Sequence, residues 1–273
     1  MKTILTRTVS GLIFIILIIG SIFMGPFTFG IVFLIFLVLG MLELLNMVKI
    51  AGYKLPVVTL LVMAVLIYDI VLLYLWNYIP AIWVAAAAPL LFLVFIFELY
   101  RKSETPIQNI GLGFLAIIYV TIPFALMNFF FYPRMDTSIP VKGVLLGFFL
   151  IIWVNDTFAY LTGMAIGKHK LFERISPKKT IEGSLGGFVF GMAAAYILSL
   201  IFKELNLYEW LGLTTVIIVF GSFGDLVESM FKRSTNIKDS GSIMPGHGGI
   251  LDRFDSVLMA SPFVFVYLMI VLS

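Results

Sequence analysis

Long apolar runs, separated by short polar segments, make up most of the chain. A helix that crosses a bilayer needs roughly 20 apolar residues, at about 1.5 Å each through about 30 Å of hydrocarbon. Runs of suitable length lie at about 9–25, 27–48, 57–76, 80–98, 108–131, 142–163, 184–203, 211–231 and 254–272. Pro or Gly marks several of the breaks between them, as at Pro26, Pro106 and Pro140. The pattern predicts an all-α, polytopic integral membrane protein with about nine transmembrane helices.

The composition supports this prediction. Of the 273 residues, 61% are hydrophobic and only 12% are charged, whereas a soluble domain carries roughly 25% charged residues. Cysteine is absent, which excludes disulfides, thiolate metal sites and a cysteine nucleophile. The first apolar run follows Lys2 and Arg7, but no small-residue cleavage site follows it. We therefore expect a retained first span and not a signal peptide. The net charge of +3 gives no indication of nucleic-acid binding.

The distribution of Lys and Arg predicts the orientation, because basic residues favour cytoplasmic loops. With nine spans, the N-terminus and every second loop would hold Lys2, Arg7, Lys49, Lys54, Arg101, Lys102, Lys168, Lys170, Arg174, Lys178, Lys179, Lys232, Arg233, Lys238 and Arg253. Of the 18 basic residues, the opposite side would keep only Arg134, Lys142 and Lys203. The N-terminus should therefore be cytoplasmic and the C-terminus outside. Loops 164–183 and 232–253 then share the cytoplasmic side, where a basic face suits an anionic substrate or anionic lipid headgroups.

Residues 225–255 differ from the rest of the chain because they combine five acids, four bases and a histidine. Asp225, Glu228, Ser229 and Lys232 share one helix face at i, i+3, i+4 and i+7. An ordinary Glu228–Lys232 salt bridge would explain part of this face. An Asp, a Glu and a Ser together near a membrane boundary favour a functional site, since ionisable groups are costly inside a bilayer. Nearby glycines would let another backbone or a ligand approach closely.

Asp252 and Asp255 stand at i and i+3 in the first turn of the last predicted helix. Acids there are favoured by the helix dipole alone. They also offer the oxygen ligands that Mg²⁺ prefers, and Asp225 could converge with them. The preceding loop contains His247, Gly248 and Gly249 and could present backbone N–H groups to an anion. His247 could contact a phosphate, although a lone loop histidine is usually only solvated.

A second polar region lies near 155–183. Asp156 falls inside a predicted span, which makes it a functional candidate. Lys178 and Lys179 could neutralise phosphates, whereas Lys168, Lys170 and Arg174 fit an ordinary cytoplasmic loop. Two further acids, Glu43 and Asp69, lie in the second and third predicted spans without a charged neighbour on their own face. They either seal helix contacts or line a cavity.

The order of these residues resembles the signature of the phosphatidate cytidylyltransferases, or CDP-diacylglycerol synthases. The matching residues are Ser229, Lys232, Arg233, Lys238, Asp239, His247, Gly248, Gly249, Asp252, Arg253 and Asp255. Met244 departs slightly, because the family more often has Leu, Ile or Phe there. Upstream, Asp156, Thr157, Ala159 and Tyr160 match, as does the run from Ser176 to Gly183 that includes Thr180 and Glu182. The resemblance covers about residues 150–256.

The resemblance implies an enzyme that joins CTP and phosphatidate to give CDP-diacylglycerol and pyrophosphate. It implies Mg²⁺, with a second metal site that K⁺ could occupy, a homodimer, and a bacterial-type inner membrane with the active site facing the cytoplasm. Asp225, Asp252 and Asp255 would hold metal, and Ser229, Lys232, Arg233, Glu228 and Asp156 would be catalytic. Substrate would meet Lys178, Lys179, Thr180, Lys238, Asp239, His247, Gly248, Gly249 and Arg253.

We expect residues 141–273, with their two cytoplasmic loops, to carry catalysis, and residues 1–140 to serve packing, lipid access or dimer contacts. Two alternatives remain open. A CTP-dependent lipid kinase of the polyprenol type would transfer the γ-phosphoryl group to an alcohol. An ion-coupled transporter would use the intramembrane acids, but its polar residues should lie near the bilayer midplane, with repeated halves that this chain lacks.

Overall fold

The computed structural model describes residues 2–133, 140–244, 246 and 248–272. Within these residues, eight helices are long and apolar enough to span a membrane, and a shorter apolar helix covers Thr8–Met24. Each of the predicted apolar runs is helical. The chain is therefore an all-α polytopic membrane protein, as the sequence pattern predicts. Two residues used in the predictions, Arg134 and His247, lie outside the described residues.

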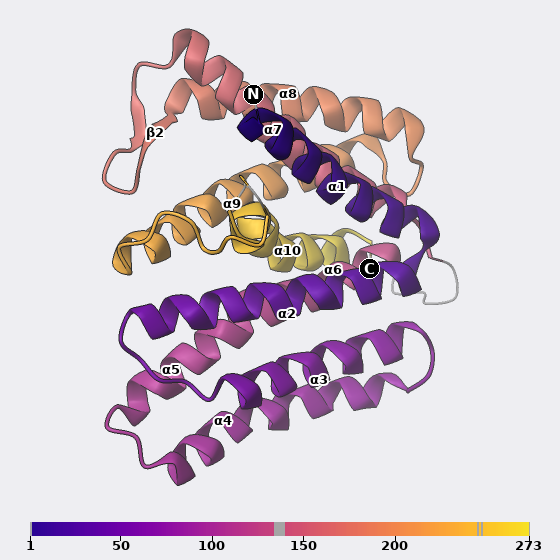
Figure 1. Cartoon of the computed structure of the whole chain (residues 1–273). Helices are drawn as coiled ribbons and strands as arrows, with labels where there is room; N and C mark the ends of the chain where they lie inside the picture. Colours follow the sequence, from indigo (N-terminus) through magenta and orange to yellow (C-terminus); the bar gives the residue numbers. More distant parts are fainter. Residues whose placement is uncertain (1, 134–139, 245, 247, 273) are drawn as a thin grey trace. The chain divides into compact units, whose positions relative to one another are not determined.

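Figure 1 shows the elements along the chain. They are α1 (Lys2–Met24), α2 (Pro26–Ile50), α3 (Val57–Leu75), η1 (Ala81–Ala86), α4 (Ala87–Arg101), α5 (Pro106–Ala116), η2 (Ile117–Thr121), α6 (Ile122–Met127), η3 (Asn128–Phe131), α7 (Gly143–Ile166), β1 (Lys170–Phe172), β2 (Ser176–Thr180), α8 (Ile181–Ile201), α9 (Leu207–Ser234) and α10 (Leu251–Val271).

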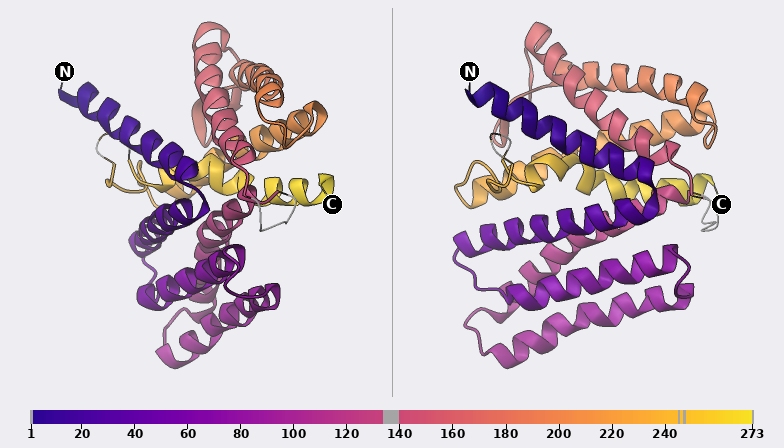
Figure 2. Two further views of the ribbon diagram at one scale, coloured as in Figure 1. Left: turned by 90° about the vertical axis from the view of Figure 1, so that its right-hand side faces the viewer. Right: turned by 45° about the vertical axis from the view of Figure 1, so that its right-hand side comes forward.

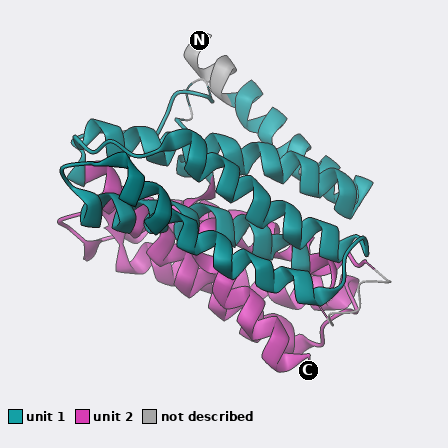
Figure 3. Cartoon of the chain, turned by 90° about the horizontal axis from the view of Figure 1, so that it is seen from below, with its two compact units in different colours: residues 1–129, 234–253 teal, residues 130–233, 254–273 magenta. Residues whose placement is uncertain are grey.

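The chain divides into two compact units, coloured separately in Figure 3. Unit 1 comprises residues 1–129 and 234–253, and unit 2 comprises residues 130–233 and 254–273. Both units are thus discontinuous in sequence, because the segment before α10 belongs with the N-terminal helices. Helix α10 begins in unit 1 and continues in unit 2.

In unit 1, helices α2, α3 and α4 lie side by side in every view of Figures 1 and 2. Their interior is apolar and aromatic, with Phe29 stacked on Phe33 at a centroid distance of 3.8 Å. One buried polar chain crosses it: the Tyr68 hydroxyl donates to the Gly30 carbonyl and accepts from Asn128 Nδ2, both at 3.0 Å. These bonds satisfy a hydroxyl that would otherwise be costly to bury.

The fifth span, Pro106–Phe131, is not one regular helix. It passes from α5 through one wide π-helical stretch, η2, into α6 and a 3₁₀ end, η3. The wide stretch lies directly before Pro123. Proline has no N–H to donate, and its ring crowds the carbonyl four residues earlier, which is that of Tyr119. A locally wider helix relieves that crowding.

In unit 2, helices α7 and α8 approach closely because small residues line their contact. A methyl group added at Gly183 would meet the Ala159 carbonyl, and one at Gly187 would meet Asn155. Small residues of this kind let membrane helices pack backbone to backbone. A two-stranded antiparallel hairpin of β1 and β2 joins the two helices, with Lys170 opposite Thr180. We expected only a loop here, since its charged sequence shows no strand-like alternation.

Helices α9 and α10 also pack closely within unit 2. Phe220 and Phe263 stack with centroids 3.4 Å apart. A Cβ at Gly224 would lie 2.9 Å from the Cβ of Met259 and would collide with the Asp255 carbonyl oxygen. The close approach expected at this glycine is therefore made by the backbone of another helix.

Candidate active site

The acids of unit 2 gather where α9 and α10 pack together. Asp225 and Ser229 share one face of α9, as their spacing predicts, and Ser229 Oγ donates to Asp225 Oδ1 at 3.3 Å. Asp255 is half-buried on α10, and its Oδ1 accepts the Ser256 N–H at 2.7 Å. The carboxylates of Asp225 and Asp156 lie near enough to Asp255 to repel it electrostatically. We call Asp156, Asp225 and Asp255 the acidic cluster.

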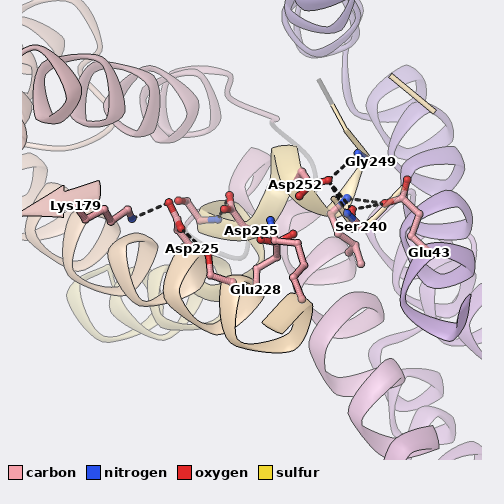
Figure 4. Close-up of polar contacts among 12 residues, drawn as sticks. Glu43, Lys179, Asp225, Glu228, Ser240, Gly249, Asp252 and Asp255 are labelled. Carbon is pink, nitrogen blue, oxygen red and sulfur yellow. Dashed lines mark hydrogen bonds and ion pairs between the residues drawn. The ribbon is translucent and has the colours of Figure 1, made fainter. Parts of the chain in front are cut away.

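Lys179 supplies a positive charge to the acidic cluster. It stands on β2, and its Nζ lies 2.7 Å from Asp225 Oδ2 (Figure 4). Its ammonium group also attracts Asp255. One ammonium thus stands among three carboxyl groups, whose oxygens are the hard donors that a cation such as Mg²⁺ prefers. The hairpin thus explains how a lysine far along the chain from α9 reaches the cluster.

Glu228 and Lys232 form an ion pair one helical turn apart on α9. Both side chains are well shielded, with 3% and 15% of their surface exposed. The simple salt-bridge interpretation of this pair is confirmed, while its contribution to catalysis stays a prediction. Arg233, the next residue, is exposed at the end of α9.

Several other predicted residues build the frame of the hairpin. Thr180 is buried and caps α8, its Oγ1 accepting the Gly183 N–H at 3.2 Å. Glu182 accepts the backbone N–H groups of Lys168 and His169 at 3.1 and 3.2 Å, which holds the turn between α7 and β1. Lys178 on β2 is exposed. The Thr180–Gly183 run therefore has a structural explanation, and its contact with substrate stays a prediction.

In unit 1, the segment before α10 folds around Asp252. Asp252 Oδ2 accepts hydrogen bonds from Ser240 N, Ser240 Oγ and Gly249 N at 2.8–2.9 Å (Figure 4). Gly248 adopts φ +84°, a conformation that glycine tolerates best, and its carbonyl accepts the Met244 N–H at 3.0 Å. Lys238, Asp239 and Arg253 are exposed, and His247 lies outside the described residues.

Two residues in this part of unit 1 were not predicted as site residues. Ser240 is buried against Asp252, and Glu43 of α2 bonds to Ser240 and to the start of α10. Because Glu43 is an acid within an apolar span, the sequence indicated that it needs a partner. Its partners lie about 200 residues away, and no local spacing could reveal them.

The acids predicted as metal ligands divide between the units, with Asp252 in unit 1 and Asp225 and Asp255 in unit 2. Among the described residues, no three His, Cys, Asp or Glu side chains are arranged as a ready-made metal site. Within unit 2, Asp225 and Asp255 do offer the hard oxygen donors that Mg²⁺ prefers, and the two groups repel one another electrostatically.

Comparison with known proteins gives the family. The profile of the cytidylyltransferase family matches residues 5–271. The chain belongs to the cytidylyltransferase family. Phosphatidate cytidylyltransferases of Staphylococcus haemolyticus and Staphylococcus aureus are each 51% identical to it over 112 residues. That of Bacillus subtilis is 50% identical over 111 residues.

Each of these stretches covers 40% of this cytidylyltransferase-family chain and 41–43% of the relative. The chain thus matches about two fifths of the length of these curated relatives. The family match itself extends over nearly the whole chain, including the N-terminal helices, for which the sequence motifs had shown no specific resemblance.

Proposed function

We propose that this chain is a phosphatidate cytidylyltransferase, which transfers CMP from CTP to phosphatidate and releases pyrophosphate. One observation carries the proposal: in a member of the cytidylyltransferase family, Lys179 is ion-paired with Asp225 beside Asp255. Acids that hold a cation, together with a lysine that meets phosphate, are what nucleotidyl transfer requires. The names of the similar bacterial proteins support phosphatidate as the acceptor.

The proposed reaction needs no strong general base, because the phosphate of phosphatidate is already an anion. Its oxygen attacks the α-phosphorus of CTP, the α–β bridging P–O bond breaks, and pyrophosphate leaves with the electron pair. The barrier is mainly charge repulsion and alignment. Lys179 and Lys178 of β2 would neutralise phosphate oxygens, with Lys232 and Arg233 from α9. Ser229 would orient Asp225 through their hydrogen bond.

The acidic cluster fits Mg²⁺ because its carboxylates repel one another and offer hard oxygen donors. Asp225 and Asp255 would hold the ion, Asp252 would serve as a further metal ligand, and a second cation such as K⁺ would take part. When bound, Mg²⁺ would neutralise charge on the phosphates and help align them. Lys179, which lies beside Asp225, would be placed to meet a phosphate oxygen of the substrate.

The setting of the reaction follows from the distribution of charge. Nine spans with a cytoplasmic N-terminus would bring the loops 164–183 and 232–253 to the cytoplasmic face of a bacterial inner membrane. CTP would enter from the cytosol, and phosphatidate sideways from the lipid. Catalysis would rest on residues 141–273, and a homodimer is the expected assembly.

The position of a label in the product tests the proposal. Purified protein in mixed micelles of phosphatidate would receive CTP labelled at either the α- or the γ-phosphorus, with Mg²⁺ present. A cytidylyltransferase leaves the α-label on the lipid and releases the γ-label in pyrophosphate. A γ-label on a lipid alcohol would instead reveal a lipid kinase. Solute flux into liposomes without any chemical turnover would point to a transporter, and either result contradicts the proposal.

A further inference from the structure

The start of α10 lacks a capping residue of its own. The first N–H groups of a helix have no partner within the helix, and Ser, Thr, Asp or Asn usually accepts from them just before the first turn. Here the residues entering the helix are Gly249 and Ile250, which carry no side-chain acceptor. Both are buried, so water is a poor substitute.

Glu43 of α2 provides the missing acceptors. Its Oε1 accepts the Ile250 N–H and its Oε2 accepts the Leu251 N–H, both at 2.9 Å. Oε2 also accepts from Ser240 Oγ at 3.1 Å. Only 5% of the Glu43 surface is exposed. Both carboxylate oxygens are therefore used, and a negative charge at a helix N-terminus is electrostatically favoured.

Ser240 connects Glu43 to Asp252. Its backbone N–H and its hydroxyl each lie 2.9 Å from Asp252 Oδ2, and the same hydroxyl reaches Glu43. The Gly249 N–H donates to the same Asp252 oxygen at 2.8 Å. Gly249 directly precedes Ile250, whose N–H is bound by Glu43. The orientation of the Asp252 carboxylate thus depends on a segment that Glu43 fixes at three points.

The glycines of this segment are fitted to Glu43. A methyl group added at Gly241 would collide with Glu43 Oε1, and one at Gly249 would collide with Glu43 Oε2 and Ser240 Oγ. Neither glycine adopts a positive φ, so backbone conformation does not require glycine at either position. Glycine is required at both positions because the Glu43 carboxylate approaches so closely that any side chain would collide with it.

We infer that Glu43 is a positioning residue for the metal-binding carboxylate Asp252, acting through Ser240 and the capped start of α10. The inference deepens the proposed function and rests on it for the role of Asp252. A group that orients a metal ligand from behind typically changes metal affinity or activity about 10- to 100-fold when it is lost. Glu43 would thereby make the N-terminal helices part of the catalytic apparatus, without touching substrate.

Two substitutions and a control test this inference in the full-length protein. Glu43→Gln keeps size but replaces one acceptor oxygen with a donor, so at least one backbone N–H loses its partner. Glu43→Asp keeps both carboxylate oxygens on a side chain that is shorter by one methylene group. Glu98→Gln is the matched control, because Glu98 is also a buried acid of unit 1, 4% exposed, and it bonds instead to Arg101, Ser103 and Asn109.

Two quantities should be measured in each variant: amide hydrogen exchange in a peptide covering 249–251, and turnover as a function of Mg²⁺ concentration. In Glu43→Gln we expect faster exchange in that peptide, about tenfold or greater loss of turnover at limiting Mg²⁺, and partial recovery at high Mg²⁺. Glu43→Asp should lie between Glu43→Gln and the unchanged protein. Glu98→Gln should leave both quantities unchanged.

The two readouts separate the failure of this inference from the failure of the proposed function. Absence of lipid product from the unchanged protein would overturn the proposed function, and with it the catalytic role of Glu43. If the protein is active, unchanged exchange at 249–251 in Glu43→Gln would overturn the capping role. Faster exchange with an unaltered Mg²⁺ dependence would show that Glu43 only stabilises the fold, which also contradicts the inference.

Discussion

Lys179 Nζ lies 2.7 Å from Asp225 Oδ2, which ties the hairpin before α8 to helix α9. Each of these side chains is about one-third exposed, at 31% and 33%. An ion pair so accessible to solvent contributes at most about 1 kcal/mol to stability. The pair therefore matters more for the charge it brings to the acidic cluster than for holding the fold.

Replacement of that lysine should affect turnover far more than stability. We expect Lys179→Met to lower turnover on the order of 10²- to 10³-fold, since it removes a cation that meets phosphate during the reaction. The midpoint of thermal unfolding in detergent should hardly change. Lys170→Met, on the exposed strand β1 of the same hairpin, serves as the control and should retain activity. Comparable losses in both variants would contradict a specific role for Lys179.

The two acids of α10 should be essential for metal-dependent turnover. We expect Asp252→Asn and Asp255→Asn each to abolish measurable product formation, because an amide is a much weaker Mg²⁺ ligand than a carboxylate. Asp255→Asn should not destabilise the protein, since it relieves repulsion from Asp225. Product would be measured across a Mg²⁺ series, with Asp69→Asn in α3 as the control. Near-normal Mg²⁺-dependent turnover in both variants would reject these ligands.

The Glu228–Lys232 pair lends itself to a double-mutant cycle. Glu228→Gln should destabilise the protein by about 3–5 kcal/mol, because it leaves a shielded ammonium without its carboxylate. Adding Lys232→Met to that variant should restore much of the stability, since no unpaired charge then remains. Unfolding in denaturant would give the coupling energy. If the double variant regains stability but not turnover, the pair also contributes to catalysis. If the stability losses of the two single variants simply add in the double variant, Glu228 and Lys232 are not energetically coupled.

Thr180 offers a test of whether a motif residue is structural. Thr180→Ala removes the acceptor for Gly183 N–H and should cost about 1 kcal/mol of stability. Thr180→Ser keeps the hydroxyl and should retain most of that stability. We expect turnover of Thr180→Ser to be nearly unchanged and that of Thr180→Ala to follow the fraction of folded protein. A large rise in KM for CTP in a fully folded Thr180→Ala would show instead that this hydroxyl binds substrate.

The fold was largely predictable because membrane burial leaves a strong signal in the sequence. The predicted runs 142–163 and 254–272 correspond to helices Gly143–Ile166 and Leu251–Val271. Helix α10 begins earlier than its apolar run because a distant acid, Glu43, accepts its first N–H groups. The wide turn before Pro123 was not predicted, since a proline alone does not tell whether a helix kinks, ends or widens.

The candidate site was predictable only where its residues share one helix. Helical spacing predicted the neighbours Asp225 and Ser229 and the pair of Glu228 with Lys232, and both contacts are present. The partnership of Lys179 with Asp225 depends on the hairpin, which the sequence did not reveal. Contacts between distant segments depend on how the helices pack, and the spacing of residues in a single sequence does not show which distant segments meet.

The discontinuity of unit 1 has a consequence for biosynthesis. Glu43 leaves the ribosome 207 residues before its partner Ile250. At roughly 5–20 residues per second, translation leaves this carboxylate without that partner for about 10–40 s. Helix α2 must therefore enter the membrane before its acid can bond to α10, and unit 1 reaches its final packing only after residue 250 has been translated. A nascent chain released before residue 250 would retain the N-terminal helices but leave Glu43 without its amide partners at the start of α10.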